Sequence, residues 1–379
     1  MKTLWLIPSF WPTRGGIETA GLLLGKGLQA EGHELLIVTD EGDPAAAAEE
    51  TVAGLPVIRL PVYRALVAAS PAALLRVAQR LTALAAAFRP DLVHLHLVGP
   101  APMGWFALRL RETLGVPLLL TVHDDVQGLR AGASTVLGRC FEAADWVTTL
   151  SQTFMTDVLG LAPHLTERVS IIYPGLVGPA RELRSLRAPV PEFLCLGRVS
   201  HEKGLDLVLT AFAQVVQTHA TTRLIIAGDG PARHLLERQA WELEVSERVT
   251  FAGMVTDEER AELFGRALAV VMPSRHREGF GLVALEAAQH GRAVIAARAG
   301  ALSEAVSLLG NGLLIAQEDA GALSAAMTQL LLHPDDAQRM GAAGQAQAAL
   351  LFSQEACAAK YSALYVKLRQ TPAIDAHSG

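Results

Sequence analysis

A strand, a glycine-rich turn and a helix are predicted in direct succession between Ala267 and Gly291, an arrangement typical of parallel α/β folds. The run Ala267–Pro273 is apolar and contains two adjacent valines, which indicates a buried strand. Leu282–His290 has helical character, and Gly291 is suited to end that helix. The chain is therefore predicted to turn sharply through glycine at the carboxyl end of a buried strand.

Two acids flank this turn and point to a phosphorylated sugar as ligand. Glu278 precedes the helix, and Glu286 lies inside it. Backbone amides at a helix N-terminus bind phosphate oxygens, because glycine permits close approach and the helix dipole adds positive charge. We expect a binding segment made of Gly279, Phe280, Gly281 and Leu282, with the two acids facing different parts of one ligand. The alternative is that Glu278 only complements the helix dipole and Glu286 is solvated.

A second strand-turn-helix unit precedes the first in the chain. Phe193–Leu196 is a short apolar strand, and helical spacing begins at Leu205. The turn between them carries Arg198, a planar fork for phosphate, and Lys203, a point charge. Ligands of open α/β sheets bind beyond the carboxyl ends of the strands, so the two turns are predicted to converge on one crevice. A solvated basic loop is the alternative.

Strand and helix patterns alternate along all 379 residues, which predicts an α/β protein with two Rossmann-like domains. The first domain is expected at residues 1–180 and the second at 192–350, with Arg181–Pro191 as a linker. A last helix is expected at about residues 354–367. Strands of the first domain are expected at Leu4–Ile7, Glu34–Thr39, Leu92–His96, Leu118–Val122 and Trp146–Leu150.

Composition excludes several classes of protein. The formal net charge is −6 and hydrophobic residues make up 51%, which argues against a disordered chain or a general nucleic-acid binder. Three widely spaced cysteines do not suggest a disulfide framework, so a reducing, cytoplasmic location is expected. Pro8 and Pro12 interrupt the apolar N-terminus, which is better interpreted as a strand than as a signal peptide. The sequence contains no run of 18 uncharged apolar residues, so no membrane span is predicted.

The order of motifs resembles the large retaining glycosyltransferase family 4, which has the GT-B fold of two Rossmann-like domains facing across a cleft. The resemblance is dense between Phe193 and about Gly312. It rests on Gly197-Arg198, Glu202-Lys203-Gly204, Ala227-Gly228-Asp229-Gly230-Pro231, Val249-Thr250-Phe251-Ala252-Gly253, Pro273-Ser274 and the segment Glu278–Glu286. Sparser landmarks in the first half are Gly15-Gly16-Ile17-Glu18, Gly32-His33-Glu34, Asp91–His96 and Thr121-Val122-His123-Asp124. The resemblance also implies that the last helix, at about residues 354–367, packs back onto the first domain.

Two segments depart from the family pattern. Ile172-Tyr173-Pro174-Gly175 stands where the family commonly has Asn-Gly, and it keeps a turn. Gly300-Ala301-Leu302-Ser303-Glu304 stands where Gly-Gly-x-Pro-Glu is common. The second change puts the close backbone approach of a second glycine in doubt, and this segment is left out of the expected site.

The resemblance implies transfer of a sugar from a nucleotide-diphosphate sugar to an acceptor hydroxyl with retention of anomeric configuration, by a front-face route. Arg198, Lys203 and the amides near Phe280 would stabilise the departing diphosphate. By resemblance, Glu286 would bind the ribose hydroxyls and His123 the donor sugar. Glu278 is assigned to a sugar hydroxyl, and the amides of Gly15 and Gly16 to the phosphates. No cofactor is expected, and no metal ion, because the chain has no Asp-x-Asp tripeptide.

Other interpretations stay open at this point. His123 could fill the interface between domains, and His94 with His96 could bind metal, although a buried or acceptor-side role is favoured. A dinucleotide oxidoreductase is disfavoured because no G-x-G-x-x-G turn opens a helix. A non-catalytic nucleotide-sugar binding protein would keep the phosphate and ribose contacts without turnover. Sugar epimerases of similar fold share the architecture but not the full set of motifs.

The acceptor is expected to be a carbohydrate or a lipid-linked molecule, in glycan, glycolipid or polysaccharide synthesis. Residues Arg59–Arg89 carry an apolar helical pattern with arginines spaced along it, among them Arg64 and Arg76. Such a helix could dock on anionic lipid at the inner face of a membrane, or it could be a solvated face over a buried stripe.

Overall fold

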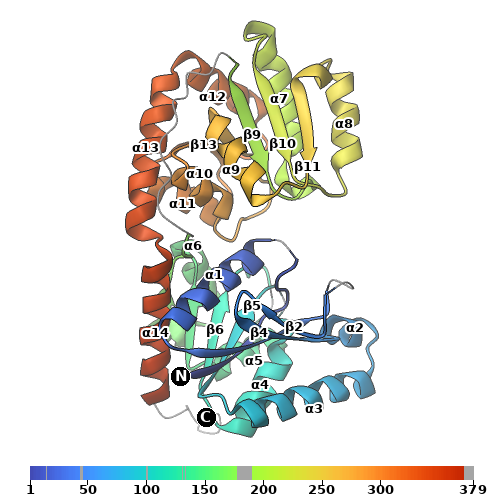
Figure 1. Ribbon diagram of the computed structural model, residues 1–379, viewed down its shortest axis with the longest axis vertical. Helices are drawn as coiled ribbons and strands as arrows, with labels where there is room; N and C mark the ends of the chain where they lie inside the picture. The colour runs from blue at the N-terminus through green and yellow to red at the C-terminus, as the bar shows by residue number, and fades with distance from the viewer. Residues whose placement is uncertain are drawn as a thin grey trace. The chain divides into compact units, whose positions relative to one another are not determined.

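The computed structural model describes residues 1–13, 15–42, 46–99, 101–129, 131–132, 134–176 and 190–370. They form two compact units (Figure 1). The first contains the described residues of Met1–Val177 and Ser353–Gly379, and the second those of Gly178–Phe352. The predicted linker Arg181–Pro191 lies outside the described residues apart from Val190 and Pro191.

The sheet of the first unit has eight strands within the described ranges, in the spatial order β3-β4-β2-β1-β5-β6-β7-β8. Their neighbours are parallel except for the antiparallel pair β3 and β4. The strands are β1 (Lys2–Leu6), β2 (Glu34–Asp40), β3 (Glu49–Val52), β4 (Leu55–Leu60), β5 (Leu92–Leu97), β6 (Leu118–Val122), β7 (Trp146–Thr149) and β8 (Val169–Ile171). The helices are α1 (Gly16–Ala30), α2 (Val62–Val67), α3 (Pro71–Phe88), α4 (Gly104–Leu114), α5 (Val136–Ala143), α6 (Gln152–Leu161), the 3-10 turn η1 (Pro163–Arg168) and α14 (Gln354–Gln370).

Both faces of this sheet are buried, because successive side chains of a strand point to opposite sides. In β1, Leu4 and Leu6 join the core under α3 and α4. Trp5 on the same strand joins the opposite core, together with residues of α1 and α14. Helix α14 runs alongside α1 (Figure 1). The last described helix of the chain is therefore part of the first unit.

The second unit has a six-stranded, fully parallel sheet in the order β11-β10-β9-β12-β13-β14 within the described residues. Its strands are β9 (Glu192–Leu196), β10 (Arg223–Ala227), β11 (Val249–Gly253), β12 (Ala269–Met272), β13 (Ala293–Ala297) and β14 (Gly312–Ile315). The helices are η2 (His201–Lys203), α7 (Leu205–Thr218), α8 (Arg233–Glu242), η3 (Ser246–Arg248), α9 (Asp257–Arg266), α10 (Leu282–Gln289), α11 (Ala301–Leu309), α12 (Ala320–Leu332) and α13 (Pro334–Leu351).

The two central strands of this sheet position the site. β9 pairs with β12 although more than 70 residues separate them in the chain, so the strand order reverses between them. A reversal of this kind leaves a crevice beyond the carboxyl ends of the two strands, because the connections leave in opposite directions. The turns that follow β9 and β12 are the two turns predicted to converge.

The segment Arg59–Arg89 is not the single helical stretch that was predicted. Arg59 lies in β4, is 5% exposed, and its guanidinium forms an ion pair with Glu50 and donates to the carbonyl oxygens of Ala47 and Trp11. The helical part is broken after α2, and Ser70 caps the start of α3. A buried arginine that satisfies backbone carbonyls serves the fold and is not available to a lipid surface.

Candidate functional site

The turn after β9 lies directly against the turn after β12. Gly204 has a φ of 67°, and a Cβ atom at this position would lie 2.3 Å from the carbonyl oxygen of Pro273. No side chain fits in that space, so glycine is required for the two backbones to approach. Gly204 also begins α7 and directly follows Lys203, which it therefore brings close to residues 273–281.

Lys203 and Glu278 meet at this contact. Lys203 Nζ lies 2.6 Å from Glu278 Oε1, and the Ser274 hydroxyl donates to the same oxygen. His276 Nε2 lies 3.6 Å from the other oxygen, Glu278 Oε2. Burial alone would raise the pKa of Glu278, but the Lys203 ammonium and His276 outweigh it, and the pKa is lowered. The geometry holds an ionised, 9% exposed carboxylate against a cation.

The helix that follows Glu278 begins without a side-chain cap in the described structure. Gly281 is its N-cap residue, with a φ of 81°, and a Cβ atom there would lie 2.6 Å from Leu302. Phe280 is 3% exposed and packs against Phe352, with ring centroids 5.5 Å apart. The buried Phe280 side chain thus anchors the turn. The first amides of α10 carry the positive end of the helix dipole.

Glu286 lies against α9. Its carboxylate forms an ion pair with Arg260. Burial raises the pKa of Glu286, and the nearby Asp257 raises it further, while Arg260 lowers it without cancelling the effect of burial. The carboxylate expected to bind ribose therefore has a cationic partner that the sequence did not predict.

Arg198 forms its described ion pair with Glu202. Its side chain is 71% exposed and lies 3.8 Å from Glu202. Three glycines at the ends of β9, β10 and β11 pack together beside it. Gly228 lies so close to Gly197 that a Cβ atom on Gly228 would be 1.8 Å from the Gly197 carbonyl oxygen. The Gly228 amide donates to the carbonyl oxygen of Gly253. This packing explains why separate family motifs each contain glycine.

In the first unit, His123 follows β6 and is partnered by another histidine. His96 Nδ1 lies 2.9 Å from His123 Nε2, and the two rings stack with centroids 5.1 Å apart. Burial lowers the pKa of His123 to about 3, so the ring is neutral near pH 7. This places His96 on β5 in direct contact with a residue predicted to act on the donor sugar.

His94 lies on the same face of β5 and is bonded differently. Its Nδ1 lies 2.7 Å from the hydroxyl of Tyr365 in α14, and its Nε2 lies 2.6 Å from the Thr121 hydroxyl. The His94 and His96 rings lie against each other in a tilted arrangement, with centroids 4.2 Å apart. Over the described residues, no group of three or more His, Cys, Asp or Glu side chains is arranged to hold a metal ion.

Gly15 and Gly16 form the start of α1. Gly15 is the N-cap residue with extended backbone, and its carbonyl oxygen accepts the Thr19 amide. A Cβ atom on Gly15 would lie 2.4 Å from the Glu18 carboxylate. Glycine therefore leaves room for the Glu18 carboxylate at the start of this helix.

Comparisons with known proteins identify the family. Residues 14–177 match the model described as Glycosyltransferase Family 4, and residues 184–347 match that of Glycosyl transferases group 1. A glycogen synthase of Mycobacterium tuberculosis is 31% identical over 299 residues, which cover 75% of this chain and 70% of the relative. The chain belongs to glycosyltransferase family 4.

Other relatives and solved structures agree with this assignment. A GDP-mannose-dependent alpha-(1-6)-phosphatidylinositol monomannoside mannosyltransferase of Mycobacterium tuberculosis is 27% identical over 91% of this chain and 92% of its own. Sucrose-phosphate synthase from Thermosynechococcus elongatus superposes with a TM-score of 0.82 at 25% identity, covering 97% and 98% of the two chains. Anabaena HepE in complex with UDP-glucose has a TM-score of 0.76 at 20% identity, with 97% and 100% covered. The predicted α/β fold, a GT-B fold of two Rossmann-like domains, is confirmed.

One segment of this glycosyltransferase that was left out of the expected site lies against it. Gly300, in the departure from the Gly-Gly-x-Pro-Glu pattern, has a φ of 60° and lies against the turn that carries Glu278. A Cβ atom on Gly300 would lie 2.9 Å from that of Arg277, and the Ala301 amide donates to the Glu278 carbonyl oxygen. The close backbone approach that seemed doubtful is kept by a single glycine.

Four residues of the glycosyltransferase that contact the expected site residues were given no such role by sequence: His96, Arg260, Ser274 and His276. Ser274 had a signal, because it stands in the Pro-Ser motif four residues before Glu278. Arg260 had none, since an arginine's partner can lie anywhere on the surface of the fold. His96 was recognised as buried but not as a partner of His123.

Proposed function

We propose that this glycosyltransferase moves a hexose from a nucleotide-diphosphate sugar to an acceptor hydroxyl with retention of configuration. The observation that carries the proposal is the Lys203–Glu278 pair beside the uncapped N-terminus of α10. A departing diphosphate needs cations and amide donors, and a sugar that loses its leaving group develops positive charge. Lys203 and the helix N-terminus supply positive charge for the diphosphate, and Glu278 supplies negative charge for the sugar.

Each residue then has one task. Lys203 and Arg198 stabilise the leaving diphosphate, together with the amides of Gly279 to Leu282. Glu278, held ionised by its neighbours, accepts hydrogen bonds from sugar hydroxyls. Glu286 accepts hydrogen bonds from the ribose. These assignments are supported by the matching positions in the family and by the charges that surround each carboxylate.

In the first unit, we propose that neutral His123 contacts the donor sugar and that the amides of Gly15 and Gly16 bind phosphate. A pocket of about 420 Å³ beyond the ends of β1 and β2 is suited to the acceptor. Its lining residues are Pro8, Ser9, Thr13, Asp40, Gly42, Val62, Tyr63, Pro102 and Met103. The mainly apolar walls and one carboxylate suit a carbohydrate or lipid-linked acceptor better than an ionic one.

The test is turnover with a set of nucleotide sugars and simple glycoside acceptors. We expect transfer from at least one donor, and a product whose anomeric proton signals show the configuration of the donor. We also expect turnover to persist in excess EDTA, because the cations of the site replace a metal ion. Inversion, or activity that is lost in EDTA and restored by Mg²⁺, would contradict the respective part of the proposal.

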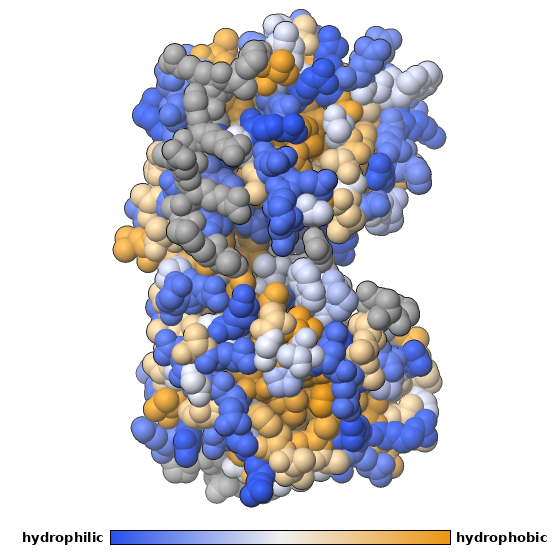
Figure 2. Space-filling view, in the orientation of Figure 1, coloured by the Kyte–Doolittle hydropathy of each residue, from blue (hydrophilic) through white to orange (hydrophobic). Residues whose placement is uncertain are grey.

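Peripheral contact with a membrane is a second proposal, favoured by the surface of α2 and α3. Exposed apolar side chains gather there, namely Tyr63, Leu66, Val67 and Leu75. Arg64 and Arg76 are exposed on the same helices, although Arg64 forms an ion pair with Glu41. Hydrophilic side chains surround smaller hydrophobic areas on the face shown in Figure 2. None of the described helices combines the length and apolar character needed to cross a bilayer.

We accordingly propose a cytoplasmic enzyme that binds the inner face of a membrane through α2 and α3. Co-sedimentation with liposomes tests the proposal, and vesicles with anionic lipid should capture the protein at low salt. Replacing Tyr63 and Val67 by Ser should reduce capture. Equal sedimentation with neutral and anionic vesicles, or none with either, would contradict it.

A further inference from the structure

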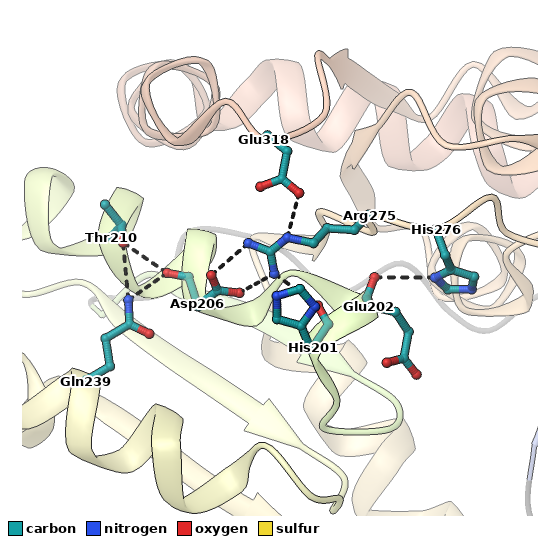
Figure 3. A network of polar contacts seen from close by, with 8 residues as sticks. All are labelled: His201, Glu202, Asp206, Thr210, Gln239, Arg275, His276 and Glu318. Atoms are coloured by element: carbon teal, nitrogen blue, oxygen red, sulfur yellow. Dashed lines mark hydrogen bonds and ion pairs between the residues drawn. The ribbon is translucent and has the colours of Figure 1, made fainter.

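The side chain of Arg275 joins three separate segments of the second unit (Figure 3). Its Nη1 and Nη2 donate to the two carboxylate oxygens of Asp206, at 2.6 and 2.7 Å. Its Nε donates to Glu318 at 2.6 Å. The arginine side chain is only 16% exposed, whereas both acids are more open. One guanidinium is therefore fixed by two carboxylates in a fork geometry that only arginine provides.

The backbone of the same residue holds the turn that carries Lys203. The Arg275 amide donates to the Glu202 carbonyl oxygen at 2.8 Å. Arg275 Nη1 also donates to the His201 carbonyl oxygen at 3.0 Å. His201 and Glu202 are the two residues before Lys203 in the turn η2. Arg275 thus fixes the backbone from which the Lys203 side chain extends.

Arg275 stands just as close to the other partner of the ion pair. It lies between Ser274, which donates to Glu278, and His276, which lies against Glu278 and contacts the Glu202 carbonyl oxygen. Gln317 donates to the carbonyl oxygens of Ser274 and Arg275 from the neighbouring segment. Arg275 therefore contacts the turn that carries Lys203, and the residues on either side of it in the chain contact Glu278.

The charges around Arg275 strengthen this anchor. The hydrogen bonds from Arg275 lower the pKa of Asp206, and those to Asp206 raise the pKa of Arg275. Asp206 lies in the first turn of α7, and its backbone oxygen accepts a bond from Gln239 of α8 (Figure 3). The anchor is thus connected to α7 through Asp206 and to α8 through Gln239.

We infer that Arg275 is a positioning residue for sugar transfer, which sets Lys203 against Glu278 without itself touching the donor. The inference rests on the proposed roles of Lys203 and Glu278. Misplacing a reacting group by about 1 Å can cost about 100-fold in rate, and loss of the anchor is expected to act in this way. Binding of the nucleotide through Glu286 should be affected much less, because no contact links Arg275 to Arg260 or Glu286 among those described.

Two variants test the inference, Arg275→Gln and Asp206→Asn, with Arg238→Gln as the matched control. Arg238 pairs with Glu242 on the exposed face of α8, away from both turns. The first readout is the rate at which Lys203 reacts with an amine-selective acylating reagent, followed by mass spectrometry. In the wild type its side chain is 27% exposed and paired, so both variants should accelerate labelling several-fold while Lys26 stays unchanged.

The second readout is the donor kinetics of the same proteins. We expect kcat to fall by about 10- to 100-fold in both variants while KM for the donor changes little. Arg275→Lys should recover little of the loss, since an ammonium cannot replace the fork. Thermal unfolding of each variant shows whether the fold is kept, and Asp206→Asn serves if Arg275→Gln does not fold.

The two readouts separate this inference from the proposed function. Unchanged labelling of Lys203 in both folded variants would overturn the inference, whether or not the protein transfers sugar. Faster labelling with unchanged kcat would overturn it as well, because the positioning would not matter for the reaction. Faster labelling in a protein that turns over no nucleotide sugar would support the role of Arg275 in placing Lys203 and overturn only the proposed function.

Discussion

Lys203 Nζ lies 2.6 Å from Glu278 Oε1, although 75 residues separate the two in the chain. The pair forms because β9 and β12 are neighbours at the centre of the sheet and the turns that follow them touch at Gly204 and Pro273. The cation keeps the buried acid ionised, and the acid in turn holds the cation at the N-terminus of α10.

Replacing Glu278 by Gln should lower turnover by orders of magnitude while nucleotide binding stays nearly intact. The amide keeps the shape of the side chain but removes the charge that would face the sugar. Isothermal titration with a nucleoside diphosphate and initial rates with the donor measure the two effects. A variant that loses nucleotide affinity in proportion to turnover would contradict the assignment of Glu278 to the sugar.

Replacing Lys203 by Ala should remove most of the activity, and added Mg²⁺ should rescue little of it. The ammonium offsets charge on the leaving diphosphate, an effect worth about 3 to 4 kcal/mol where one such donor is lost. Rates would be compared in EDTA and in excess Mg²⁺. Full rescue by the ion would show that a metal can take the place of Lys203.

Nucleotide affinity should fall as the pH falls through the pKa of Glu286, because this carboxylate must be ionised to accept hydrogen bonds from ribose. Burial and Asp257 raise the pKa of Glu286, while Arg260 opposes the rise. Binding is therefore present above this raised pKa and lost as the pH falls through it. In Arg260→Gln the loss should begin at a higher pH, and in Glu286→Ala affinity should be weak at every pH. Calorimetric titrations of the wild type and both variants at a series of pH values would test this. Equal profiles for wild type and Arg260→Gln would refute it.

His123 should not contribute a titration near its ordinary pKa of 6.5 to the pH profile of kcat. Burial lowers its pKa to about 3, so the ring stays neutral above that value and gains its proton only in acid. His96→Leu removes its hydrogen-bond partner and should lower kcat by about 10-fold or more without weakening nucleotide binding. An acidic limb near 6.5 in the wild type that disappears in His123→Ala would contradict the neutral state.

Tyr365→Phe should destabilise the first unit by about 1 to 3 kcal/mol, the cost of leaving buried polar partners without a hydrogen bond. The Tyr365 hydroxyl accepts from Trp5 Nε1 and bonds to His94 Nδ1, which ties α14 to the sheet. Urea unfolding followed by tryptophan fluorescence would measure the loss. The neighbouring exposed Val366→Ala is the control and should change stability by less than about 0.5 kcal/mol. Equal midpoints for both variants would show that these bonds contribute nothing.

Local patterns in the sequence were sufficient to predict the two α/β domains and the turns that carry the chemistry. Helix α10 begins at Leu282 as predicted. Gly281 directly before it adopts a left-handed conformation that favours glycine, whereas the residues after it are helical. Strand β12 is shorter than the apolar run that predicted it, since only Ala269–Met272 pair with neighbouring strands. Apolar periodicity reports burial, and burial extends beyond the hydrogen-bonded ladder.

Only the tertiary structure decided which charged and polar side chains meet. The partnerships of Arg275 with Asp206, of Arg260 with Glu286 and of His96 with His123 join residues 26 to 69 positions apart. Side-chain length and charge are visible in a sequence, but a partner is selected by strand order and by the direction in which each helix leaves its sheet. The sequence by itself therefore determined the fold and the kinds of residues at the site, and the packing of the strands determined their contacts, because the contacts depend on distances that no local pattern encodes.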